Sequence, residues 1–140
     1  MPGFITPQGL KHLDFYQYKS GKYTWLDNAL QPYWNYVVSL VPLTVASNLI
    51  TFIGWLLLLS ATLIMLCYDF TFKNTIPSWC FYYAAFCLWS YSTLDAIDGK
   101  QARRTKSSSP LGQLFDHGCD AFSVSFLVIQ IGEAAQLEYE

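Results

Sequence analysis

Four aspartates stand at helical spacing in a chain that is otherwise largely apolar. Asp95 and Asp98 are three residues apart, and Gly112, Asp116 and Asp120 follow one another at intervals of four. On α-helices each set lies along one face, so two short helix faces could direct all four carboxylates to one point. Carboxylates gathered in a low dielectric repel one another, and a bound divalent cation relieves that repulsion. All-oxygen ligands favour Mg²⁺ or Mn²⁺, and a pair of such ions about 4 Å apart suits phosphoryl transfer.

The residues around the aspartates fit the same chemistry. Gly99 and Gly112 leave the backbone uncovered where a bulky ligand would approach. The stretch between the two aspartate pairs is basic and could bind a pyrophosphate, which arginine contacts bidentately. Its basic residues are Lys100, Arg103, Arg104 and Lys106. His117 could transfer a proton near neutral pH, although helix geometry turns it about 100° away from Asp116.

Each of these residues also has a structural interpretation. A single aspartate inside a membrane could pair with Arg103, and the basic run could anchor the chain at the cytoplasmic surface. His117 could be a hydrogen-bonded helix histidine with no chemical role. A cation pathway would distribute its carboxylates across the bilayer, whereas these cluster at one end of the apolar runs. Four aspartates at this spacing, with two glycines and an arginine among them, favour a binding site.

The elements that position these residues are predicted to be membrane helices. Of the 140 residues, 53% are apolar and only 13% are charged, whereas roughly 25% charged residues is typical of soluble domains. A small soluble domain could not bury so much apolar surface. The net charge of −2 gives no case for nucleic-acid binding. The sequence therefore predicts an all-α integral membrane protein.

Three apolar runs predict three transmembrane helices, over residues 49–68, 77–94 and 111–132. Ser47 and Asn48 offer a start signal for the first helix, and Pro77 suits the first turn of the second. The sequence SSSP at residues 107–110 predicts a break before the third helix. Residues 1–46 are rich in Trp and Tyr, which indicates amphipathic helices at the membrane interface; a loosely ordered tail is the alternative. We expect two units, this interfacial segment and a transmembrane domain at residues 47–140.

Basic residues orient the predicted bundle. They gather in the N-terminal segment and between the second and third spans, whereas Lys73 alone lies between the first and second. By the positive-inside rule the aspartates then lie at the cytoplasmic end. No cleavable signal peptide is expected. The cysteines form no CxxC pair and are expected to be buried small hydrophobic residues. They are Cys67, Cys80, Cys87 and Cys119.

The spaced residues resemble the signature of the CDP-alcohol phosphotransferase family. Every position and every gap of that signature is present. It stands here as Asp95, Asp98, Gly99, Ala102, Arg103, Gly112, Asp116 and Asp120. The surrounding sequences TLDAIDGKQARRT and SSSPLGQLFDHGCD look like the eukaryotic choline/ethanolamine phosphotransferase branch. Upstream, SNLITFIG resembles that family's entry to its first span, with Ser47 where a proline usually stands.

The resemblance implies transfer of phosphocholine or phosphoethanolamine from a CDP-alcohol to diacylglycerol, with release of CMP. By this likeness Asp95, Asp98 and Asp116 would hold Mg²⁺ or Mn²⁺, and Asp120 would complete the metal site or act as a base. His117 is the other candidate general base. The CDP site would be lined by Gly99, Ala102, Arg103 and Gly112 and bordered by Asn48. The family's usual location implies the endoplasmic reticulum or Golgi membrane.

The family's catalytic core contains more spans than the three expected here, and this difference raises an alternative function. The chain could be a catalytically inactive relative that serves as a structural subunit of a larger membrane complex, in the membrane of another organelle. As an enzyme it would need further helices to form the walls of the lipid-binding cavity, and a homodimer or other membrane subunits could supply them. The residues do not decide between choline and ethanolamine as the head group.

Overall fold

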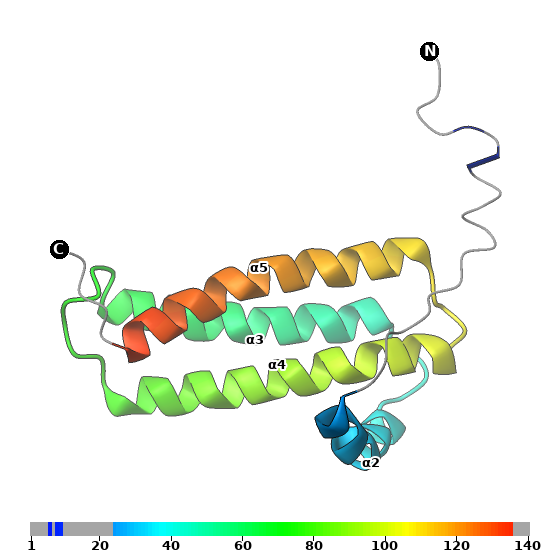
Figure 1. Cartoon of the computed structure of the whole chain (residues 1–140), viewed down its shortest axis with the longest axis horizontal. Coiled ribbons are helices and arrows are strands. Elements are labelled where there is room, and N and C mark those ends of the chain that lie inside the picture. Colours follow the sequence, from blue (N-terminus) through cyan, green and yellow to red (C-terminus); the bar gives the residue numbers. More distant parts are fainter. Residues whose placement is uncertain (1–5, 7, 10–23, 136–140) are drawn as a thin grey trace.

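A computed structural model describes residues 6, 8, 9 and 24–135, and over that part of the chain the regular structure is entirely helical. The four helices that it gives with full bounds are α2 (Trp25–Leu40), α3 (Ser47–Tyr68), α4 (Ser78–Arg104) and α5 (Pro110–Ala134) (Figure 1). The predicted all-α fold is confirmed. The remaining residues of the predicted interfacial segment, 1–5, 7 and 10–23, lie outside the described residues, as do residues 136–140.

Local sequence signals account for several of the helix ends. Thr24 accepts a hydrogen bond from the backbone of Asp27, whose carboxylate accepts one from the Thr24 backbone, so α2 begins with a capping box. Ser109 caps α5 by accepting a hydrogen bond from the Gly112 backbone at 3.1 Å, and Pro110 occupies the first helical position. The predicted break before the third long helix is therefore confirmed.

The end of α4 differs from the prediction. The apolar run ends near Leu94, but the helix continues through the aspartates and the basic residues to Arg104. It stops where Lys106 adopts a left-handed conformation with φ of 55°. The backbone N–H of Ser107 donates to the carbonyl of Ala102, which is the hydrogen bond that closes a Schellman motif. The basic connection predicted between the aspartate pairs is thus largely helical, and only residues 105–109 link α4 to α5.

Helix α3 is the centre of the bundle because it packs against both α4 and α5. A core cluster joins Ala61 and Met65 of α3 to Cys80, Ala84 and Cys87 of α4. Polar contacts add to the packing on the other side. The Gln130 side chain of α5 donates to the Thr62 hydroxyl at 2.9 Å and to the Leu58 carbonyl at 3.3 Å. Such hydrogen bonds between helices are a common means of association in membranes.

Two of the helices, α3 and α5, are long and apolar enough to cross a membrane. Helix α4 has the length, and its crossing of the bilayer stays a prediction. Many large apolar side chains of the three long helices are exposed on the outside of the bundle, as expected of a surface in contact with lipid. Three of the cysteines are buried as predicted, whereas the prediction for Cys67 is wrong, because it is exposed near the end of α3.

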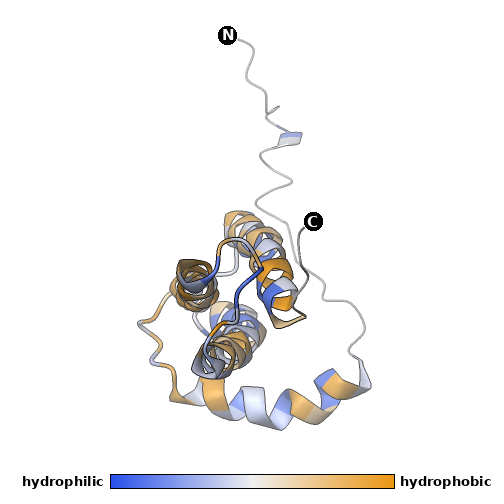
Figure 2. Ribbon diagram, turned by 90° about the vertical axis from the view of Figure 1, so that its left-hand side faces the viewer, coloured by the Kyte–Doolittle hydropathy of each residue, from blue (hydrophilic) through white to orange (hydrophobic). Residues whose placement is uncertain are grey.

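Opposite ends of the bundle have different connections. At one end Asp69 follows α3 and accepts hydrogen bonds from the Asn74 and Thr71 backbones, at 2.5 and 2.8 Å, which hold its pKa well below the usual range. At the other end α2 lies across the bundle axis, against the last turns of α4 (Figures 1 and 2). There it packs on α4, with Val38 buried against Ile50 and Ile97.

Candidate functional site

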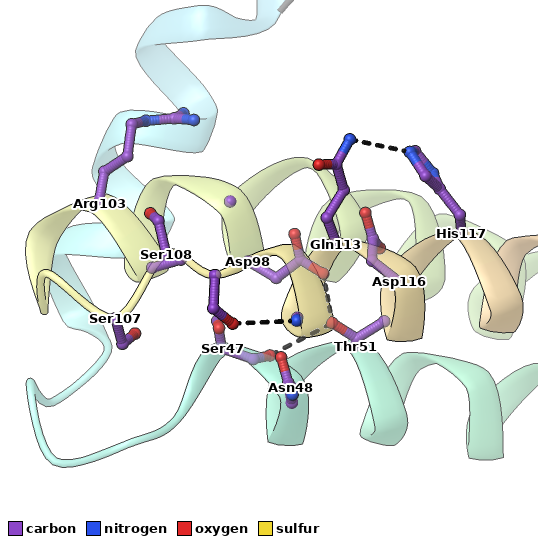
Figure 3. Close-up of a pocket in the computed structure, with 14 residues that line it drawn as sticks. Ser47, Asn48, Thr51, Asp98, Arg103, Ser107, Ser108, Gln113, Asp116 and His117 are labelled. Atoms are coloured by element: carbon purple, nitrogen blue, oxygen red, sulfur yellow. Dashed lines mark hydrogen bonds between the residues drawn. The ribbon is translucent and has the colours of Figure 1, made fainter. Parts of the chain in front are cut away.

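A cavity of about 560 Å³ opens at the end of the bundle where α4 meets α5. Its walls come from the first turns of α3, the last turns of α4, the serine-rich connection and the first turns of α5 (Figure 3). The lining residues are Ser47, Asn48, Thr51, Asp98, Gly99, Ala102, Arg103, Ser107, Ser108, Ser109, Gly112, Gln113, Asp116 and His117. Of the residues that the family resemblance assigns to the site, all except Asp95 and Asp120 are among them.

The four aspartates converge in two overlapping groups beside this cavity. Ligand atoms of Asp95, Asp98 and Asp116 all lie within 4.8 Å of one another, and those of Asp116, His117 and Asp120 do the same. Asp116 belongs to both groups. Its Oδ1 atom is buried and has no hydrogen-bond partner in the structure, which is costly unless a cation or a proton satisfies it. The donor set, mainly carboxylate oxygen, fits hard divalent cations.

Two of the carboxylates, those of Asp98 and Asp120, each accept a hydrogen bond from a side chain on a neighbouring helix. The Thr51 hydroxyl of α3 donates to Asp98 Oδ2, and both residues are almost fully buried, at 4% and 6% exposed. The Tyr91 hydroxyl of α4 donates to Asp120 Oδ1 of α5 at 2.5 Å. Neither Thr51 nor Tyr91 was predicted as a site residue.

Sequence spacing did contain a signal for both residues. Thr51 is three positions after Asn48 and Tyr91 is four before Asp95, so each lies on the same helix face as a predicted site residue. The hydrogen bonds join residues 47 and 29 positions apart. Spacing alone does not reveal such pairs, because they depend on how the helices pack.

The two glycines have different surroundings. A Cβ atom on Gly112 would lie 3.3 Å from both Asn48 Oδ1 and Ser109 Oγ, so glycine at this position lets α3 and the α5 cap come together. A Cβ on Gly99 would be 3.7 Å from the Arg103 guanidinium, an ordinary contact. Gly99 therefore keeps the cavity wall open, and Gly112 keeps the helices close.

Of the four basic residues expected to offer charge for a pyrophosphate, only Arg103 lines the cavity. Lys100 instead donates to the Gln31 and Asn35 side chains of α2, at 2.6 and 2.9 Å. Arg104 donates to the carbonyl of Val38 and to the Gln101 side chain. Lys106 ends α4 and is exposed. The basic run therefore divides, with Arg103 at the cavity and with Lys100 and Arg104 bound to α2.

His117 lies at the exposed rim of the cavity. Its imidazole is joined to the Gln113 side chain by a hydrogen bond of 3.3 Å (Figure 3). It also shares a group with Asp116 and Asp120, despite the angle that separates neighbouring residues on a helix. Arg103 lies on the far side of Asp98 from His117 in this view. The cavity thus has a cationic end and an end with aspartates and an imidazole.

Comparison with known proteins identifies the family. Residues 44–138 match the sequence pattern of the CDP-alcohol phosphatidyltransferase family. The chain belongs to this family. The match covers every signature residue and all three long helices, so the resemblance found in the sequence is confirmed for this part of the chain.

Curated members of the family are similar to the chain over most of its length. The chain is 46% identical to cholinephosphotransferase 1 of Xenopus laevis over 123 residues, which are 88% of this chain and 31% of that protein. It is 40% identical to choline/ethanolaminephosphotransferase 1 of Arabidopsis thaliana over 134 residues, which are 95% of this chain and 34% of that protein. The chain therefore spans about a third of the length of these relatives.

Proposed function

We propose that this chain carries the nucleotide and metal site of a phospholipid-synthesising transferase. The reaction would move phosphocholine or phosphoethanolamine from its CDP-alcohol to diacylglycerol and release CMP. The observation that carries the proposal is the convergence of the eight signature residues, from two helices, around one cavity and its adjoining carboxylates. The names of the similar proteins support this choice of substrates.

The carboxylates suit two ions of Mg²⁺ or Mn²⁺. Asp95, Asp98 and Asp116 would hold one, and Asp116 and Asp120 the other, since Asp116 belongs to both groups. Its buried, unpartnered Oδ1 atom supports a ligand role. When bound, such ions would neutralise the negative charge of the pyrophosphate and of the departing CMP.

The remaining residues would bind the nucleotide. Arg103 stands across the cavity from the imidazole and can contact a phosphate through two parallel N–H groups. Gly99 and Ala102 offer a wall with little side-chain bulk, and Asn48 offers an amide at the border of the cavity. This arrangement would orient the CDP-alcohol with its pyrophosphate between the guanidinium and the carboxylates.

His117 is the better-placed proton acceptor. It lines the cavity, whereas Asp120 does not and already accepts a hydrogen bond from Tyr91. The diacylglycerol hydroxyl would attack the phosphorus that bears the choline or ethanolamine and pass its proton to the imidazole. A new phosphorus–oxygen bond forms as the bond to CMP breaks, and CMP leaves with the bonding electrons.

In the cell, we expect this site in the endoplasmic reticulum or Golgi membrane, with the cavity facing the cytoplasm. The basic residues at the cavity end of the bundle support that orientation. Residues 47–140 would form the transmembrane unit, and further membrane helices would complete the lipid-binding walls.

The proposal is tested on the chain reconstituted in lipid nanodiscs. Binding of CDP-choline and CDP-ethanolamine is measured with and without Mg²⁺, and CMP release is measured after diacylglycerol is added. We expect Mg²⁺-dependent binding that Arg103→Gln weakens at least tenfold, because a charge-assisted bidentate contact contributes about 1.5–3 kcal/mol.

Lys106→Gln is the matched control, because it removes a nearby positive charge that lies outside the cavity. It should bind nucleotide like the unaltered chain. Binding that needs no divalent cation, or equal loss in the two variants, would contradict the proposed site. Nucleotide binding without CMP release would favour the structural-subunit alternative over independent catalysis.

A further inference from the structure

Tyr91 stands behind the cavity, at a point where three helices meet. It lies on α4, one turn before Asp95, and is partly buried. Its hydroxyl donates to Asp120 Oδ1 on α5 at 2.5 Å, which is short for a hydrogen bond between two side chains. The residue does not line the cavity, so it would reach the substrates only through Asp120.

The third helix fixes the position of the tyrosine ring. A Cβ atom on Gly54 of α3 would lie 3.3 Å from Tyr91 Cδ2 and 3.4 Å from Leu94 Cβ. Because glycine stands there, the ring lies directly against the α3 backbone. The phenol is thus held between α3 and α5, and its hydroxyl can occupy only a narrow range of positions.

The carboxylate that it holds would otherwise be pushed away from the site. Asp120 lies in a group with Asp116 and His117, and Asp116 is in turn grouped with Asp95 and Asp98. Like charges so close together repel one another, and a rotation of the Asp120 side chain would relieve the repulsion. A hydrogen bond from a fixed phenol opposes that rotation. A carboxylate that accepts one hydrogen bond still has a second oxygen for another partner.

We propose that Tyr91 is a positioning residue that holds one oxygen of Asp120 so that the other can bind the divalent cation. The inference rests on the proposed function, since it concerns one ligand of the proposed metal site. Tyr91 is not one of the signature residues, and it does not line the cavity. Its effect on the reaction passes entirely through the orientation of Asp120.

The test measures metal binding directly and needs no turnover. Mn²⁺ is titrated into the chain in nanodiscs, and free and bound ions are distinguished by electron paramagnetic resonance. We expect Tyr91→Phe, which keeps the ring and removes the hydroxyl, to weaken Mn²⁺ binding about 10- to 100-fold, as loss of an outer hydrogen bond to a metal ligand commonly does. At saturating Mn²⁺ the affinity for CDP-choline should stay unchanged.

Tyr82→Phe is the matched control, since Tyr82 lies on the same helix and is 77% exposed. It should bind Mn²⁺ like the unaltered chain. A purely structural role for Tyr91 would lower thermal stability without a selective change in Mn²⁺ affinity. Equal Mn²⁺ affinities for Tyr91→Phe and Tyr82→Phe would therefore overturn the inference while leaving the proposed function intact.

A second pair of variants moves the ring without removing its hydroxyl. Gly54→Ala forces the ring to shift by a few tenths of an ångström, and we expect weaker Mn²⁺ binding. Gly118→Ala adds the same methyl group on α5 with no atom within 4 Å, and it should change nothing. Unchanged binding in Gly54→Ala counts against the inference. An unaltered chain that binds no Mn²⁺ overturns the proposed metal site, and the inference with it.

Discussion

At the scale of single residues, the hydrogen bond from Thr51 to Asp98 joins two side chains that are both nearly inaccessible to water. A buried carboxylate without a donor is costly, so the hydroxyl supports the aspartate in the absence of a cation. Asp116 is the contrasting case, because its buried Oδ1 atom has no donor in the structure. The site therefore combines carboxylates that the protein holds with an oxygen that a cation can satisfy.

Replacement of Thr51 by valine keeps the shape of the side chain and removes the donor. We expect Thr51→Val to lower the free energy of unfolding by about 1–3 kcal/mol without divalent cations. Mg²⁺ should restore part of the loss, because the ion replaces the missing partner of Asp98. Thermal unfolding in detergent, with and without Mg²⁺, measures both effects. Thr51→Ser keeps a hydroxyl and should behave like the unaltered chain, and equal unfolding temperatures for the two variants would disprove the role.

The positions of the aspartates could be predicted from the sequence because helix periodicity places residues three or four apart on one face. The roles of Lys100 and Arg104 could not. Their charge indicated an anion site, but the structure has them bound to α2. Charge reveals what a side chain can bind, whereas its partner depends on which helix packs beside it. Thr51 and Tyr91 were missed for the same reason.

At the scale of the elements, α4 shows why apolar runs predict helices better than they predict helix ends. The run ends near Leu94, but the backbone hydrogen bonds continue for ten more residues, to Arg104. Charged residues are acceptable in a helix, so they end a membrane span without ending the helix. This extension carries Asp98 and Arg103 to the cavity, and Asp95 to the group of carboxylates beside it, on one continuous helix.

The stop of α4 depends on Lys106, which occupies the left-handed position of the Schellman motif where glycine is usual. That conformation costs a residue with a side chain about 1–2 kcal/mol. We expect Lys106→Gly to stabilise the chain by about 0.5–1 kcal/mol, since the gain is partly offset by greater freedom of the unfolded chain. Thermal unfolding provides the measurement. Lys106→Ala, which removes the charge and keeps the strain, should give no such gain, and a rise of equal size in both variants would assign the effect to charge.

At the scale of the whole molecule, α2 and the bundle lie at a steep angle to each other (Figures 1 and 2). One side of α2 packs on the bundle through Val38 and Trp34. Another side is apolar and exposed, with Trp25 at 81% and Tyr36 and Leu40 each at 64%. Since α3 and α5 are long and apolar enough to cross the bilayer, we expect a helix across their ends to run along the membrane surface. Trp and Tyr are enriched at that depth.

This arrangement predicts how deeply each side of α2 lies in the bilayer. Leu40 and Asn28 are both exposed and lie roughly 120° apart around the helix. Spin labels are attached at Leu40→Cys or Asn28→Cys, in a chain whose four cysteines are replaced by alanine, and the chain is reconstituted in vesicles. Collisions of each label with oxygen, which dissolves in lipid, and with a water-soluble nickel chelate are then compared.

We expect the label at position 40 to collide more often with oxygen and the label at position 28 to collide more often with the nickel chelate, because only the apolar stripe enters the interface. If both labels respond alike, α2 does not lie on the membrane, and its hydrogen bonds to Lys100 and Arg104 would serve the bundle alone.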